Sequence, residues 1–358
     1  MKEIKFSNYE AFNIGNYPLS SKESNDGVAL LQEGAFNLYA MVPCPMLPRF
    51  NREFQESIEA YNKKHDTPLY SATLAGVGHD EVEEILRNTE NIEDLPEAFI
   101  STGSHWQLCH NFRRRFIDTG LYRPYFPPHF AGAMPEKWKK IADKYKQGFL
   151  AVSSWDFVYD LSFGEDGPFP KRFIDLARPE FEGMITLHSC DQSPGSMALL
   201  RRLKDEGGPE ALAGFARNVG LIKHFAKILK DLGSGKSNTT PFNFIPRPVT
   251  TQIPSHKRFA LIDLEDGRIP MDISILVKQD RFDDAKEALA FFYSKTCRKL
   301  FNRGSFEYVD ELDPDERFAF PDWDALIASD ADESKTQLTA EFMLNFRGET
   351  DTGKGCLA

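Results

Sequence analysis

The sequence is poor in cysteine and contains no long apolar run. Its 358 residues include five cysteines, an odd number with no Cys-x-x-Cys pair, which argues against a disulfide framework and a zinc ribbon. No apolar segment approaches the roughly 18–20 residues that cross a bilayer. The opening MKEIKFSNYEAFN has acidic residues where a signal peptide has an apolar core. We expect reduced thiols and a cytoplasmic chain, or a periplasmic or extracellular one if a signal was removed.

Positive charge is also scarce. The chain has 43 Lys and Arg against 54 Asp and Glu, a net charge of −11, so its average surface repels polyanions. We therefore expect no nucleic-acid partner. A hydrophobic content of 41% over this length predicts two or three domains with cores of their own.

The order of apolar segments predicts an α/β protein. Residues 1–33 lack periodicity and are expected to form an N-terminal arm. Apolar runs at 36–42, 68–75 and 98–101 predict strands, and a helical spacing from Leu47 to Tyr61 separates the first two. Strands that alternate with helices are typical of a parallel sheet.

The later segments continue this pattern. Residues 149–159, 259–263 and 271–277 have strand character. Residues 221–232 place apolar side chains at helical spacing and are expected to form a helix.

The segment SCDQSPGSMALL follows an expected strand that ends at His188. Ser193 is an N-cap candidate, and Pro194 suits the first helical position. Helix N-termini at the carboxyl ends of strands bind anions or polar groups in open α/β sheets. We expect a bulky residue in place of Gly195 to abolish binding without unfolding the protein.

Four segments carry a family resemblance: PKRFIDLARPEFEGMITLH at 170–188, SPGSMALLRRLKDEGGPEALAGF at 193–215, EDGRIPMDISILVKQ at 265–279 and DDAKEALAFFYSK at 283–295. In this order and spacing, the chain resembles the type II periplasmic solute-binding proteins of ABC transporters over about 34–304. The resemblance is to the cluster with iron-, polyamine- and thiamine-binding members.

The resemblance implies two lobes, each a mostly parallel sheet flanked by helices, joined by two crossing strands. Lobe 1 would comprise 34–156 and 268–358, and lobe 2 would comprise 157–267, with the ligand cleft between them. The implied function is capture of an anionic molecule or a metal species by hinge closure. The implied partners are the ligand and the transporter's membrane subunits, and we expect a monomer that is not an enzyme.

Placing the sequence on this plan gives the ligand-binding candidates, which are Cys44, Thr102, Ser104, His105, Trp155, Asp156, Cys190, Asp191, Ser193, Gly195 and Ser196. Two thiols and an imidazole, from Cys44, His105 and Cys190, suit a transition metal or a metal cluster as ligand. In the other interpretation, these cysteines only fill apolar space or provide a reactive thiol. The histidines at positions 110, 129, 188 and 224 are interpreted as satisfied or surface residues.

Two alternatives to a transport role stay open. The first is an enzyme on the same fold with a cysteine in the cleft, as in thiamine-precursor synthases. The second is a cytoplasmic ligand sensor or metal carrier. Where ferric-binding members present adjacent tyrosines, this chain has PFNFIPRP at 241–248, which disfavours iron bound by tyrosinate.

Overall fold

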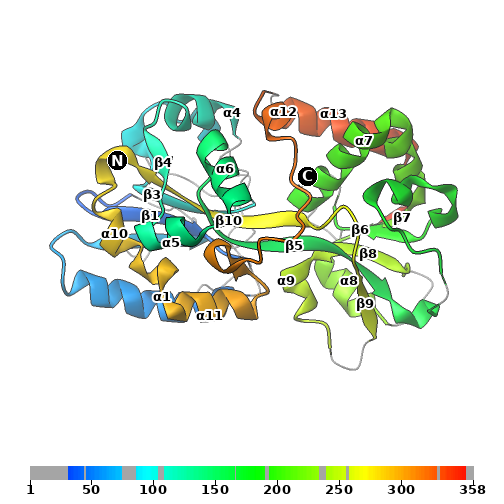
Figure 1. Ribbon diagram of the computed structural model, residues 1–358, viewed down its shortest axis with the longest axis horizontal. Helices are drawn as coiled ribbons and strands as arrows, with labels where there is room; N and C mark the ends of the chain where they lie inside the picture. Colours follow the sequence, from blue (N-terminus) through cyan, green and yellow to red (C-terminus); the bar gives the residue numbers. More distant parts are fainter. Residues whose placement is uncertain are drawn as a thin grey trace. The chain divides into compact units, whose positions relative to one another are not determined.

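A computed structural model describes residues 31–43, 46–74, 86–103, 109–165, 167–189, 193–233, 239–254, 258–328 and 331–351. The contacts divide the chain into two compact units (Figure 1). Unit 1 comprises Met1–Val152 and Asp272–Pro314, and unit 2 comprises Ser153–Met271 and Asp315–Ala358. Two strands, β5 (Phe149–Asp160) and β10 (Ile269–Lys278), have residues in both units.

Unit 1 contains a mixed sheet with the strand order β2-β1-β3-β10. Its strands are β1 (Phe36–Met41), β2 (Leu69–Leu74), β3 (Ala98–Thr102), β4 (Tyr122–Pro124) and β11 (Glu307–Tyr308), with the first part of β5 and most of β10. β1 is parallel to β2 and β3, whereas β10 is antiparallel to β3 and β4. The strands that the sequence predicted at 36–42, 68–75 and 98–101 therefore form a parallel core with antiparallel additions.

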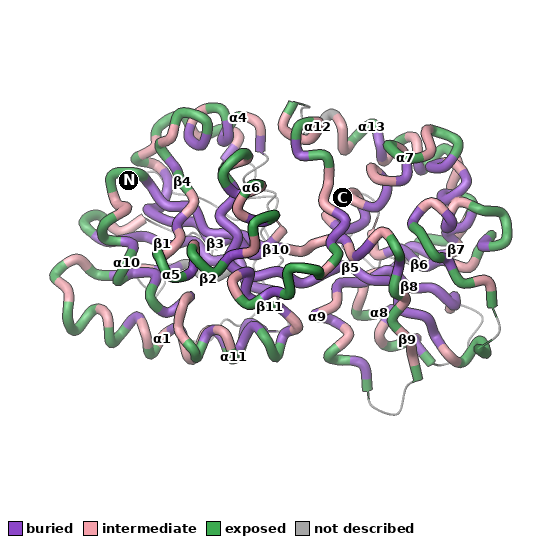
Figure 2. Tube along the Cα trace, in the orientation of Figure 1, coloured by how far each residue is buried: buried purple, intermediate pink, exposed green. Residues whose placement is uncertain are grey.

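The helices of unit 1 cover this sheet. They are α1 (Leu47–Asn62), α4 (His110–Phe112), the π-helix Arg113–Ile117, α5 (Pro128–Ala133), α6 (Glu136–Tyr145), α10 (Ala285–Ala288) and α11 (Lys295–Arg303). α1 and α11 are far apart in the sequence but lie side by side (Figure 1), where Phe50 stacks on Phe301 with ring centroids 6.3 Å apart. The apolar spacing of α1 explains this, because one face of the helix is buried and the other exposed (Figure 2).

A buried ion pair lies at the amino-terminal ends of β1 and β3. The Glu97 carboxylate accepts from the backbone N–H of Asn37 at 2.6 Å, from Asn37 Nδ2 at 2.9 Å and from Lys278 Nζ at 3.2 Å. Burial of both charges is tolerable because each one is paired and hydrogen-bonded. The pair links β10 to the parallel strands of unit 1.

Unit 2 contains a sheet with the strand order β12-β7-β6-β8-β5, and β9 also pairs with β5. The strands are β6 (Ile185–Leu187), β7 (Val219–Lys223), β8 (Phe242–Pro246), β9 (Phe259–Ile262) and β12 (Glu349–Asp351), with the second part of β5. β12, β7, β6 and β8 are parallel, and β5 is antiparallel to β8. The carboxyl ends of four neighbouring strands therefore share one edge.

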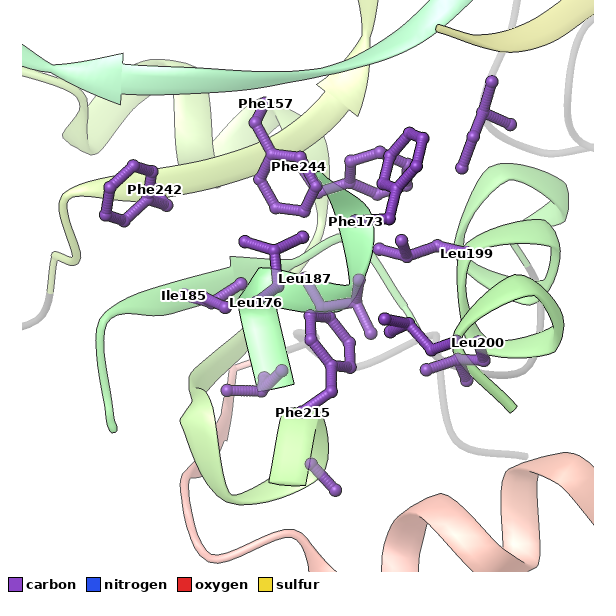
Figure 3. Packing of buried hydrophobic residues seen from close by; sticks show 14 of the residues in the cluster. Phe157, Phe173, Leu176, Ile185, Leu187, Leu199, Leu200, Phe215, Phe242 and Phe244 are labelled. Atoms are coloured by element: carbon purple, nitrogen blue, oxygen red, sulfur yellow. The ribbon is translucent and has the colours of Figure 1, made fainter. Parts of the chain in front are cut away.

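Helices pack on both faces of this sheet. They are α7 (Pro194–Asn218), α8 (Phe225–Asp231), α9 (Arg247–Thr250), α12 (Trp323–Ala328) and α13 (Ala331–Asn345). Leu199 and Leu200 of α7 belong to one buried cluster with Phe157 and Phe244 of the sheet (Figure 3). Ile228 of α8 belongs to a second cluster, which contains Val158, Ile245 and Val249. Side chains alternate along β5, so Trp155 and Phe157 point to the α7 face while Asp156 and Val158 point to the other.

Two expectations need correction. We assigned residues up to 358 to lobe 1, but the contacts of Asp315–Ala358 place this segment in unit 2. There, Lys204 of α7 forms an ion pair with Glu341 of α13 at 2.7 Å, and β12 extends the sheet beside β7. We also expected one helix over 221–232, but Leu221 lies in β7 and the helix begins at Phe225. Pairing with strands on both sides outweighs the helical spacing.

None of the helices within the described ranges combines the length and the apolar character needed to cross a bilayer.

Candidate functional site

Three neighbouring parallel strands of unit 2 are each followed directly by a histidine or an arginine. His224 follows β7, His188 follows β6 and Arg247 follows β8. β6 lies between the other two strands and is parallel to both, so the three residues leave the sheet at the same edge. Ligands of open α/β sheets bind outside this edge. This makes it the candidate site.

Trp155 packs directly on the first turn of α7. A Cβ atom added at Gly195 would lie 2.0 Å from Cδ2 of the indole and 2.3 Å from its Cγ, so only glycine allows this approach. The ring also stacks on Phe244, with centroids 5.8 Å apart. The indole is therefore held in one position beside the helix start.

The start of α7 has the N-cap that the sequence predicted. Ser193 Oγ accepts from the backbone N–H of Ser196 at 3.3 Å, and Pro194 occupies the first turn. Ser196 Oγ donates to the carbonyl of His188 at 2.7 Å and thereby ties the helix to the end of β6. The connecting residue Ser189 has φ +52°, a left-handed conformation that is costly for any residue except glycine.

The two histidines have different tautomers. His188 Nδ1 lies 3.3 Å from the carbonyl of Lys223, which only accepts, so Nδ1 carries the proton and Nε2 a lone pair. His224 Nδ1 accepts from the backbone N–H of Ala226 at 3.3 Å, so its Nε2 carries the proton. The site therefore offers one imidazole acceptor and one imidazole donor.

An aromatic stack keeps His188 uncharged. Its ring stacks on Trp155, with centroids 6.0 Å apart and an interplanar angle of 13°, and packs against His224 and Phe225, each 5.4 Å away. Burial lowers the pKa of His188 from 6.5 to about 4, with a smaller effect from His224. Burial also lowers the pKa of His224, assisted by Lys227. Both imidazoles are neutral at pH 7.

Arg247 is anchored through one nitrogen. Its Nε donates to Asp156 Oδ2 at 2.7 Å and to Ser154 Oγ at 3.0 Å, and Ser154 Oγ also lies 3.0 Å from Asp156 Oδ2. The Asp156 side chain is 2% exposed and that of Arg247 is 26% exposed. Nε is therefore held in a buried network while the rest of the guanidinium reaches the surface.

We call these residues the strand-end cluster. It comprises Trp155, Asp156, His188, Ser193, Gly195, Ser196, His224, Phe225 and Arg247. Of the predicted ligand-binding residues, the structure brings together Trp155, Ser193, Gly195 and Ser196 at the start of α7, whereas Asp156 points to the other face of β5 and contacts Arg247. That they bind a ligand stays a prediction.

The other predicted residues are not part of this cluster as described. Thr102 is in unit 1, where its Oγ1 donates to the carbonyl of Met41 at 3.0 Å. Cys44, Ser104, His105, Cys190 and Asp191 lie outside the described residues. Within the described ranges, no three His, Cys, Asp or Glu side chains group closely enough to hold a metal ion.

Sequence reasoning missed Arg247, His188, His224 and Phe225. We interpreted both histidines as satisfied or surface residues, and each has a hydrogen-bond partner; they also pack together beside Trp155. Their position directly after a strand was the signal that could have identified them. We expected a bulky residue at Gly195 to abolish binding without unfolding the protein, but the overlap with Trp155 means that a larger residue there would also disturb the packing.

Comparison with known proteins gives one family match. Residues 93–328 match the family described as bacterial extracellular solute-binding protein. No functionally curated protein matches the chain.

Several solved structures share the fold. Iron-bound HitA from Pseudomonas aeruginosa has a TM-score of 0.62 at 12% identity, over 86% of this chain and 99% of that one. Ferric binding protein from Campylobacter jejuni has a TM-score of 0.58 at 16% identity, over 87% and 100%. The periplasmic binding protein AfuA from Actinobacillus pleuropneumoniae, with fructose-6-phosphate bound, has a TM-score of 0.57 at 13% identity, over 88% and 99%. These likenesses confirm the predicted fold.

Proposed function

Because the chain belongs to the bacterial extracellular solute-binding protein family, we propose that it captures a small anionic molecule at the strand-end cluster. The protein then delivers this molecule to the membrane subunits of an ABC transporter. The packing of Trp155 on the start of α7 carries the proposal, because it sets an aromatic wall beside a helix N-terminus.

The cluster has the composition of a small-molecule site. Such sites combine apolar walls with a few fixed polar groups. Trp155 and Phe225 supply the wall, and the imidazoles of His188 and His224 supply an acceptor and a donor. α7 is interrupted at Gly208, where the backbone is not helical, and the positive end of its first segment, which begins at Pro194, favours a negatively charged group.

We propose that the protein binds its ligand without transforming it. Cys109 and Cys297 are the cysteines within the described ranges; neither is in a disulfide, and both are buried. Burial raises the pKa of Cys297 to about 12, which keeps the thiol protonated and unreactive. The structural relatives named above are binding proteins or an iron-bound protein.

The family description also bears on where the protein works. We expected a cytoplasmic chain, with a periplasmic or extracellular one as the alternative, and an extracellular family favours that alternative. We propose that the protein acts as a monomer outside the cytoplasmic membrane.

A metal species is the second candidate cargo. His188 donates from Nδ1 to a carbonyl, and within the described ranges its Nε2 has no hydrogen-bond partner, the arrangement that metal-binding imidazoles adopt. Cys190 follows two positions later in the sequence. Iron held by adjacent tyrosines is disfavoured, because β8 has Phe244 and Ile245, both buried.

Native and denaturing mass spectrometry of anaerobically purified protein test these proposals. We expect an added organic mass in the native spectrum that is lost on denaturation and is unchanged after long incubation. A metal mass would instead support the second cargo. A bound compound converted to another mass would contradict the non-enzymatic role. Equal masses, with no thermal shift from any compound in a panel of organic acids, phosphate esters and metal salts, would contradict ligand capture.

A further inference from the structure

We infer that Arg247 binds an oxyanion of the ligand, a carboxylate or a phosphate, through the two Nη atoms of its guanidinium. The inference rests on the proposed function, because it specifies which group of the captured molecule the strand-end cluster recognises. Arg247 and the partners of its Nε all lie in unit 2.

Arg247 uses only one of its three guanidinium nitrogens within the described ranges. A guanidinium has five N–H donors in a planar fork, and only Nε is used here, by Asp156 and Ser154. Within the described ranges, neither Nη atom has a hydrogen-bond partner. The side chain is 26% exposed, and within the described ranges neither Nη atom is among the buried side-chain atoms without a partner, so the Nη end of the guanidinium reaches solvent.

Arg298 of the same chain pairs with its carboxylate in a different way from Arg247. Arg298 donates from Nη1 and Nη2 to the two carboxylate oxygens of Asp310, at 2.8 Å and 2.7 Å. This parallel pairing is the usual geometry of an arginine–carboxylate pair, and it occupies the fork. Arg247 pairs with its carboxylate through Nε instead, so the fork stays open.

The residues that hold Nε of Arg247 are rigidly placed. Ser154 is fully buried and the Asp156 side chain nearly so, and both lie on β5 inside the sheet. A fork that is fixed before binding loses little conformational entropy when the ligand arrives. Two parallel N–H···O bonds match the edge of a carboxylate or a phosphate well. They match an uncharged group poorly.

Arg247 lies at the sheet edge that also carries Trp155 and the two histidines. Trp155 is paired with Pro246 in the β5–β8 register, so Arg247 follows the residue opposite the indole. It also leaves the same sheet edge as His188 and His224. Because Asp156 points to the face of β5 opposite the indole, a molecule that contacts both the fork and Trp155 would have to cross this sheet edge.

Four proteins test the inference: wild type, Arg247→Lys, Arg247→Gln and the double variant Asp156→Asn/Arg247→Gln. The double variant removes both charges and leaves no unpaired buried carboxylate. Arg258→Gln is the matched control, because Arg258 is an exposed arginine of unit 2 in an ion pair with Glu165. Isothermal titration calorimetry with citrate and inorganic phosphate, and with fructose as an uncharged probe, measures affinity. Circular dichroism confirms folding.

We expect citrate or phosphate to bind wild type and Arg258→Gln alike, and about 10- to 100-fold more weakly to all three Arg247 variants. Lysine should not rescue binding, because a single ammonium cannot form the two parallel bonds. Equal oxyanion affinity in wild type and in the folded double variant would overturn the inference and leave ligand capture intact. Binding of fructose but of neither oxyanion by wild type would do the same. Failure of all three probes would overturn it as well, and the mass measurement would then decide separately whether the protein captures a solute.

Discussion

Replacing Gly195 by alanine tests how closely Trp155 packs on the start of α7. The new Cβ atom would lie 2.0 Å from Cδ2 of the indole. An ordinary carbon–carbon contact is about 3.5 Å, so the ring or the helix must move by about 1.5 Å. Overpacking of this kind costs about 1–3 kcal/mol. For a domain of this size, we expect the melting temperature to fall by about 2–8 °C.

Gly132 provides the matched control. It lies in the helix α5, where an added Cβ atom would have no neighbour within 4 Å. Gly132→Ala should therefore leave stability unchanged or raise it by up to about 1 kcal/mol, because alanine favours helix more than glycine does. Thermal unfolding followed by circular dichroism measures both variants.

A double-mutant cycle identifies the cause. Trp155→Ala removes the ring that the new methyl group would strike, so Gly195→Ala should cost almost nothing in that background. The coupling energy should therefore equal most of the single-variant cost, about 1–3 kcal/mol. An equal cost in both backgrounds, or a Gly195→Ala variant as stable as wild type, would refute the close packing.

Three further predictions concern charge and backbone strain. The pKa of His188 falls to about 4 on folding. Between pH 6.5 and 4 the unfolded chain therefore binds more protons than the folded chain. The free energy of unfolding then decreases as the pH falls through this window, by about 3 kcal/mol in total. His188→Phe keeps a ring on Trp155 and should lose that much less stability between pH 7 and pH 4 in urea titrations; identical pH profiles would contradict this. Ser189→Gly relieves a left-handed φ and should raise the melting temperature, by an amount equivalent to about 0.5–1 kcal/mol; a lower melting temperature would show that serine is not strained there. Glu97→Gln leaves the Lys278 ammonium buried and unpaired and should cost about 3–5 kcal/mol in urea denaturation, whereas Glu97→Gln/Lys278→Met should recover most of it; no recovery would mean that charge is not the cause.

Local pattern was enough to predict the main strands of both units. The runs at 36–42 and 149–159 correspond to β1 (Phe36–Met41) and β5 (Phe149–Asp160), because buried strands are continuous apolar segments. The helix start at Ser193 was also predictable, since capping is local chemistry.

Features that depend on distant residues were not predictable in this way. Leu221 continues the helical spacing of α8, but it lies in β7 because strands on both sides pair there. The bond from Arg247 to Asp156 joins residues 91 positions apart, so no local pattern indicates it. The tautomer of His188 likewise depends on the carbonyl of Lys223 in the neighbouring strand.

Hydrogen–deuterium exchange of the loaded and the ligand-free protein tests the central claim most directly, because it locates the bound molecule on the chain. If a solute binds at the strand-end cluster, exchange should slow in peptides that contain residues 186–189, 193–198, 223–226 and 245–249. Unchanged exchange in all four segments, with slower exchange only in other parts of the chain, would contradict the claim.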